Sequence, residues 1–125
     1  MKRIFVAIVA CLALMSCQSK DFQPTPSEVV SASFSAAQSQ DYESLVNYFF
    51  FDEEDRADLL NFLATYAADS YQSRSGIDSV EIVSENVSED GYYATVESTV
   101  RYCDGTSETT DSDLVWLDGY WFINI

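Results

Sequence analysis

The chain is short and strongly acidic: its 125 residues carry 21 carboxylates against six lysines and arginines, which gives a net charge of −15. This length supports one domain with one hydrophobic core. A surface with this negative charge repels the phosphate groups of nucleic acids, and we therefore exclude nucleic-acid binding. Because the chain has no histidine, it cannot build a Ser–His or Cys–His pair, and any catalysis would have to use carboxylates and tyrosines.

The first sixteen residues have the pattern of a signal peptide. Lys2 and Arg3 precede an apolar run over residues 4–15. A helix of that length rises about 18 Å, too little to span a hydrocarbon core of about 30 Å. A positive start, a short apolar run and a small residue at the junction predict a leader over residues 1–16.

The junction Leu14-Met15-Ser16-Cys17 resembles the bacterial lipobox. The resemblance implies that Cys17 receives diacylglycerol, that cleavage falls before it, and that lipid anchors the mature chain to a membrane. An ordinary signal peptide in which Cys17 has no role is the alternative. Cleavage at Cys17 removes Lys2 and Arg3, which leaves four cations against the 21 carboxylates and a net charge of −17.

The remaining cysteines support an anchor over a disulfide. Cys11 leaves with the leader and Cys17 takes the lipid, so Cys103 has no partner for a bridge, and no Cys/His cluster indicates zinc. In lipoproteins of this kind Gln18, in place of Asp, favours the outer membrane, on its periplasmic side or at the cell surface. We expect a tether over residues 17–24 and one folded domain over residues 25–125.

Three helices are predicted to open that domain. Thr25, Pro26 and Glu28 form a capping box with proline at the first helical position, which predicts a helix over residues 26–38. Asp41 is expected to cap a second helix. The spacing of its apolar side chains indicates one buried face: Tyr42, Leu45, Val46 and Phe49.

A third helix is expected to follow the acidic run 52–55, whose carboxylates suit a helix N-terminus. Calcium binding is the alternative reading of that run, but the glycine and terminal glutamate of a calcium loop are absent. The apolar residues of this helix predict a buried stripe: Leu59, Phe62, Leu63 and Tyr66.

The last fifty residues predict an antiparallel sheet. Asp-Gly pairs at 90–91, 104–105 and 118–119 separate four β-like segments, and Asp-Gly is a strong signal for a two-residue hairpin turn. We therefore expect a four-stranded meander. Strands of about ten residues are long, so the sheet should twist strongly or contain a bulge.

The final hairpin, LVWLDGYWFINI, does not alternate between apolar and polar residues. A sheet that is apolar on both faces needs cover on both, and the helices cover only one. We expect the other face to meet a second copy of the chain in a homodimer; a membrane-adjacent contact or a covering loop is the alternative.

Several segments together resemble one known fold. They are TPSEVVSASFSAAQSQDYESLVNYF, GIDSVEIVSENV, YYATVESTVRYCDGTSE and LVWLDGYWFINI. Their order and spacing resemble small bacterial lipoproteins of unknown function that carry a nuclear transport factor 2-like domain, also called a cystatin-like cone. The resemblance implies an α+β fold in which three N-terminal helices pack on a curved four-stranded antiparallel meander. It implies no particular activity.

We expect a non-catalytic ligand-binding or protein-interaction module that uses neither a metal nor another cofactor. A pocket for a small apolar ligand would lie where helices meet the sheet. Its candidate lining residues, which plain core packing would also explain, are Tyr48, Phe62, Tyr66, Tyr93 and Trp121. The alternative is an acid–base enzyme of the isomerase or dehydratase type, which needs a carboxylate inside that pocket; Glu97 and Asp69 are the candidates.

Overall fold

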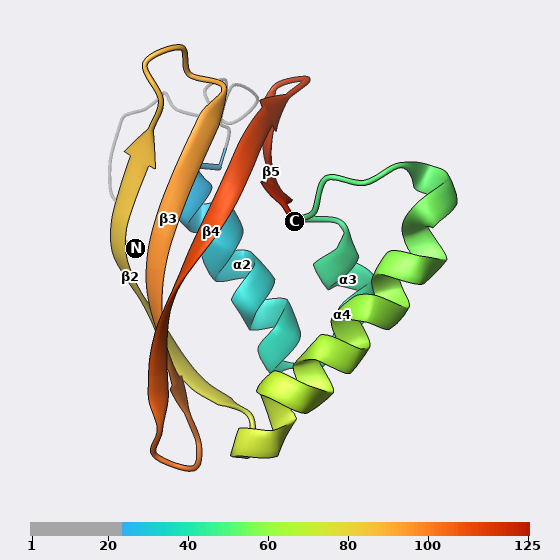
Figure 1. Ribbon diagram of the computed structural model, residues 1–125, viewed down its shortest axis with the longest axis vertical. Coiled ribbons are helices and arrows are strands. Elements are labelled where there is room, and N and C mark those ends of the chain that lie inside the picture. The colour runs from blue at the N-terminus through green and yellow to red at the C-terminus, as the bar shows by residue number, and fades with distance from the viewer. Residues whose placement is uncertain (1–23) are drawn as a thin grey trace, which may run out of the picture.

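The computed structural model describes residues 24–125, and α2 (Pro26–Gln38) is its first helix. The capping box forms as expected: Thr25 Oγ1 accepts from the Glu28 N–H at 3.1 Å, and Glu28 Oε1 accepts from the Thr25 N–H at 2.8 Å. Small residues such as Ser33, Ala36 and Ala37 are buried on one face of α2, so the helix lies close against the concave side of the sheet (Figure 1).

The second helix is shorter than its apolar spacing predicts. α3 (Tyr42–Val46) ends three residues before Phe49. Beyond it, the carbonyl of Tyr48 accepts from the Ile123 N–H, and the Phe50 N–H donates to the Ile123 carbonyl, both at 2.8 Å. Residues 48–50 therefore join the edge of the sheet, because the last strand offers their backbone groups better partners than another helical turn would.

The third helix has a short 3₁₀ entry and exit. η2 (Glu53–Asp55) leads into α4 (Arg56–Ser70), and η3 (Gln72–Arg74) follows. Residues 52–55 are all exposed, and no group of three or more acidic or cysteine side chains in residues 24–125 is placed to hold a metal ion. No helix in this same range is long and apolar enough to cross a membrane.

The expectation that the whole apolar stripe of α4 is buried is wrong. Leu63 is buried, but Phe62 is 50% exposed and Tyr66 is 46% exposed. The reason is the position of the helix: α4 packs along α3 and stands away from the sheet (Figure 1). Part of the apolar face of α4 is therefore exposed to solvent.

The four strands form the predicted meander. They are β2 (Ile77–Val87), β3 (Tyr93–Tyr102), β4 (Ser107–Leu117) and β5 (Tyr120–Asn124), antiparallel in the order β2-β3-β4-β5. The pairing of β2 with β3 shifts register between Ile77 and Ser79 and again between Ile82 and Ser84. These irregularities confirm the expected bulge in a long, curved sheet.

Only one of the three Asp-Gly pairs makes a two-residue turn. Between β4 and β5, Asp118 has φ 53° and Gly119 has φ 90°, as such a turn requires. The other two loops are longer. In them Asp90 accepts from the Tyr92 N–H and Asp104 accepts from the Thr106 N–H, so their carboxylates fold the chain by hydrogen bonding.

The core lies between α2 and the concave face of the sheet and continues under α3. Its most enclosed large side chains, each at most 1% exposed, are Leu114, Val30, Val46, Val96 and Val100. The inward residues of β3 alternate as predicted. The core therefore fixes one face of the sheet.

The last hairpin is apolar on both faces, as its sequence indicates. On the inner face Trp116 opposes Trp121, with ring centroids 5.3 Å apart. The opposite face carries what we call the outer apolar patch, a set of wholly or partly exposed side chains: Phe50, Tyr93, Val115, Leu117, Tyr120 and Phe122.

Candidate ligand cavity

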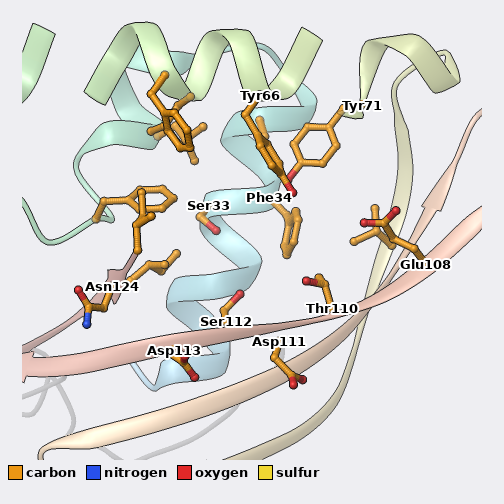
Figure 2. A pocket seen from close by; sticks show the side chains of 18 of the residues that line it. Ser33, Phe34, Tyr66, Tyr71, Glu108, Thr110, Asp111, Ser112, Asp113 and Asn124 are labelled. Carbon is orange, nitrogen blue, oxygen red and sulfur yellow. The ribbon is translucent and has the colours of Figure 1, made fainter. Parts of the chain in front are cut away.

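A cavity of about 300 Å³ opens between α2, α4 and β4, where β5 ends. It is the space left because α4 does not lie on the sheet. Figure 2 shows side chains from both helices and from β4 lining it. Its lining includes aromatic residues of the helices and polar residues of β4, namely Phe34, Phe62, Tyr66, Tyr71, Val100, Tyr102, Glu108, Thr110, Asp111, Ser112 and Asp113.

One wall of the cavity is a chain of aromatic rings. Ring centroids lie 6.3 Å apart for Phe62 and Tyr66, 5.7 Å for Tyr66 and Tyr71, and 6.1 Å for Tyr71 and Tyr102. Phe34 of α2 reaches the same group, 6.4 Å from Tyr71. This wall suits an apolar or aromatic group, because flat rings offer large contact areas at little cost in side-chain freedom.

Two tyrosines, the buried Tyr102 and the half-buried Tyr71, add hydroxyl groups to this wall. Tyr102 is 3% exposed, and within residues 24–125 its hydroxyl has no hydrogen-bond partner. Burial raises the pKa of Tyr71 above its ordinary value, and the neighbouring Tyr66 adds to this; burial likewise raises the pKa of Tyr102. Both hydroxyls are neutral at pH 7, as tyrosine hydroxyls ordinarily are, and the unpaired hydroxyl of Tyr102 is enclosed by neighbouring protein atoms.

The opposite wall is polar and comes from β4. Figure 2 shows Thr110 and Ser112 pointing into the cavity, while Asp111 and Asp113 point away from it on the other side of the strand. At one end Glu108 accepts from Arg74 across 2.9 Å. The cavity thus has an aromatic side and a polar side, which is made of two hydroxyls and one carboxylate held in an ion pair.

The structure brings two of the five expected pocket residues together. Phe62 and Tyr66 line the cavity. Tyr48 packs between the two parts of the core, Trp121 pairs with Trp116, and Tyr93 lies 59% exposed in the outer apolar patch. These three do not line the cavity. Cys17, the predicted lipidation site, lies outside the described residues.

Sequence reasoning missed the residues that make up most of the cavity. Phe34 stands on the buried face that the spacing of α2 indicates, and Tyr102 on the inward face of β3, so either could have been proposed. Glu108, Thr110 and Ser112 gave no such signal, because the polar sequence of β4 does not show which alternate residues face the helices. The register with β3 decides this.

The carboxylates considered for acid–base catalysis lie elsewhere. Glu97 is on the outer face of the sheet, 3.4 Å from the Ser84 hydroxyl that donates to it, and Asp69 is exposed on α4. Neither lines the cavity. The carboxylate that does face the tyrosines, Glu108, is held in its ion pair with Arg74.

Comparisons with known proteins show the fold. A crystal structure of a candidate nuclear transport factor 2-like transpeptidase from Campylobacter jejuni superposes with a TM-score of 0.66 at 13% identity, covering 81% of this chain and 98% of that one. A solution structure of a SEC-C motif containing protein from Rhodopseudomonas palustris gives 0.55 at 19% identity, covering 81% and 76%. No protein-family model and no curated protein matches the sequence. The helices and antiparallel sheet of this chain therefore form a nuclear transport factor 2-like fold.

Proposed function

We propose that the protein is a lipid-anchored, non-catalytic binding module that holds an apolar or aromatic group of its ligand in the cavity between α2, α4 and β4. The volume of about 300 Å³ is at the lower end of the range for small-molecule sites. It fits one side chain or one small ring system better than a whole large ligand.

The observation that carries the proposal is the exposure of Phe62 and Tyr66. Both line the cavity, where the Phe62 ring lies 6.3 Å from the Tyr66 ring and the Tyr66 ring lies 5.7 Å from the Tyr71 ring, yet each side chain remains about half exposed. Burying apolar surface stabilises by roughly 25 cal/mol per Å². A ligand that fills the cavity would bury the exposed surface of Phe62 and Tyr66, and this burial would favour binding.

The absence of histidine from the whole chain favours binding over catalysis, because the common nucleophile–base pairs need one. Lipid on Cys17 would place the cavity near a bilayer. Eight residues, 17–24, span at most about 28 Å when extended, so the domain would remain close to the membrane surface. The protein would then bind its ligand at the membrane surface.

A titration with indole tests the cavity. The full protein, ¹⁵N-labelled and solubilised in dodecyl maltoside, should show saturable amide shifts at Phe34, Tyr66 and Val100. Ser112→Phe fills the space and should abolish them. Thr109→Phe adds the same side chain to the opposite face of the same strand and should leave them unchanged. Shifts that never saturate, or that persist in Ser112→Phe, would overturn the proposal.

A further inference from the structure

Half of β4 is an open sheet edge that borders the cavity. β5 pairs with β4 only along Asp113–Leu117. Within residues 24–125, no strand pairs with residues 107–112 on that side, and Figure 1 shows β4 continuing well past the end of β5. An unpaired edge presents free backbone donors and acceptors to another extended chain.

The register identifies which backbone groups are free. The Trp116 N–H donates to the Tyr92 carbonyl at 2.9 Å, and the Thr106 carbonyl accepts from the Tyr102 N–H at 2.8 Å, so even-numbered residues of β4 turn their backbone groups toward β3. Antiparallel pairing alternates residue by residue, and the β3–β4 register has no shift. Thr109 and Asp111 therefore direct their N–H and C=O groups away from the sheet.

An added strand would share the two faces of β4. Its residues opposite Thr110 and Ser112 would point into the cavity, and the residue opposite Asp111 would lie on the outer face, since directly opposed residues point the same way. Such a strand would continue the line of β5, antiparallel to β4. Its side chains would therefore alternate: one would enter the cavity, and the next would lie on the outer face of the sheet beside Asp111 and Asp113.

The charges indicate what the outward residues should be. Each arginine in the described part of the chain is already in an ion pair: Arg56 with Glu53, Arg74 with Glu108 and Arg101 with Glu81. Among residues 24–125, Asp113 accepts a hydrogen bond only from the Thr95 hydroxyl, at 3.1 Å. The carboxylates of Asp111 and Asp113 are thus not neutralised, and the net charge of −15 attracts basic partners over longer distances.

We propose that the ligand of the cavity is an extended, basic peptide segment of a partner protein. It pairs with the backbone of Thr109 and Asp111, inserts aromatic or aliphatic side chains into the cavity, and places lysine or arginine beside Asp111. The proposal rests on the cavity function proposed above. A second copy of this chain is disfavoured at this edge because its own β4 carries the same carboxylates, and like charges directly opposed destabilise pairing.

The test uses a capped peptide, Phe-Lys-Phe-Lys-Phe-Thr, whose first residue lies opposite Ser112 just beyond the end of β5, titrated into the full protein in dodecyl maltoside by calorimetry. In the pairing described, the Lys amides face the edge and the Phe amides face solvent. N-methylation of the two Lys amides should weaken binding at least tenfold. N-methylation of the amides of the second and third Phe, which face solvent, should change binding less than threefold. Equal effects of the two modifications, or none, would overturn strand addition.

Charge is tested separately. Replacing both peptide lysines with glutamate should weaken binding at least tenfold, and Asp111→Lys in the protein should reverse that preference. Glu89→Lys makes the same charge change in the loop between β2 and β3 and should keep the preference for the basic peptide. Retention of the basic preference by Asp111→Lys would contradict the proposed contact.

The outcomes separate the two proposals. If indole binds saturably and the basic peptide does not, the peptide proposal fails and the cavity function stands; if neither binds, both fail. If the peptide dissociates a dimer that persists in Leu117→Lys, seen by light scattering, or shifts the amides of residues 18–23, the edge is already occupied by this protein itself. Either result would overturn the assignment of the edge to a partner protein.

Discussion

The guanidinium of Arg74 donates to the carboxylate of Glu108 across 2.9 Å, and this ion pair joins the segment after α4 to the edge strand of the cavity. The guanidinium carbon also lies 4.8 Å from the centroid of the Tyr102 ring. One cation therefore neutralises the carboxylate at one end of the cavity and covers the buried tyrosine beside it.

Replacing Arg74 should change both stability and charge at the cavity. Both partners of the ion pair are more than a third exposed, so with the cation–π contact we expect Arg74→Met to lower the free energy of unfolding by about 1 kcal/mol. It should also strengthen binding of the basic peptide, because Glu108 is no longer neutralised. Urea unfolding and calorimetry measure the two effects. Arg56→Met, which removes the pair with Glu53 at the start of α4, is the control and should leave peptide binding unchanged.

Tyr71 should make the protein sensitive to alkali. Burial raises the pKa of Tyr71 in the folded state, whereas in the unfolded chain the pKa is about 10. Above pH 10 the unfolded state therefore binds fewer protons, and stability falls as pH rises; below that pH the contribution of Tyr71 is fully present. Urea midpoints between pH 8 and 11.5 should fall less steeply for Tyr71→Phe than for the native protein. Tyr120→Phe, at an exposed position, should keep the native slope, and identical slopes for all three proteins would contradict the assignment.

Two leucines of β4 should differ sharply in their contribution to stability. Leu114 is 1% exposed under α2, whereas Leu117 is 43% exposed in the outer apolar patch. We expect Leu114→Ala to cost about 3 kcal/mol, because it removes buried methyl groups and leaves a cavity. Leu117→Ala should cost about 0.5 kcal/mol or less. Chemical unfolding of both variants measures this, and similar costs would show that the two faces of the hairpin are not distinguished as described.

The outer apolar patch should make the protein dimerise. Contiguous exposed apolar side chains on one face mark interaction surfaces, so we expect a homodimer through the C-terminal hairpin at high micromolar concentration. Leu117→Lys should shift light scattering to the monomer mass. Val83→Lys makes the same charge change at an exposed position of β2 and should remain dimeric. A native protein that is monomeric at this concentration would rule out the dimer.

Mass spectrometry of the purified protein tests the predicted lipid anchor. Protein purified from its own membrane should carry acyl mass on Cys17 and lack residues 1–16, and Cys17→Ser should lose that mass and leave the membrane fraction. Two or three acyl chains hold a protein durably, since each buried CH₂ contributes about 0.8 kcal/mol. The same spectrum would reveal any small molecule that co-purifies in the cavity. An intact leader, or an unmodified Cys17 thiol, would show that the anchor is absent.

Local sequence signals predicted the parts of this fold that depend on nearby residues. The capping box fixed the start of the first helix at Pro26, and the alternation of β3 fixed which of its side chains face the core. Asp118-Gly119 likewise specified its turn, because few residue pairs accept positive φ at both positions. Short-range sterics and hydrogen bonding are sufficient for these features.

The cavity depended on contacts between distant segments. Phe49 left its helical register because Tyr48 and Phe50 found partners on Ile123, and Phe62 stayed exposed because α4 packs on α3 and not on the sheet. Whether Thr110 and Ser112 face the helices is set by pairing with β3, and the free edge of β4 exists because β5 pairs only from Asp113 onward. The sequence by itself determined the elements and the acidic charge. The tertiary structure decided where those elements leave a space, because packing between segments far apart in the chain is not encoded in the local pattern of any one of them.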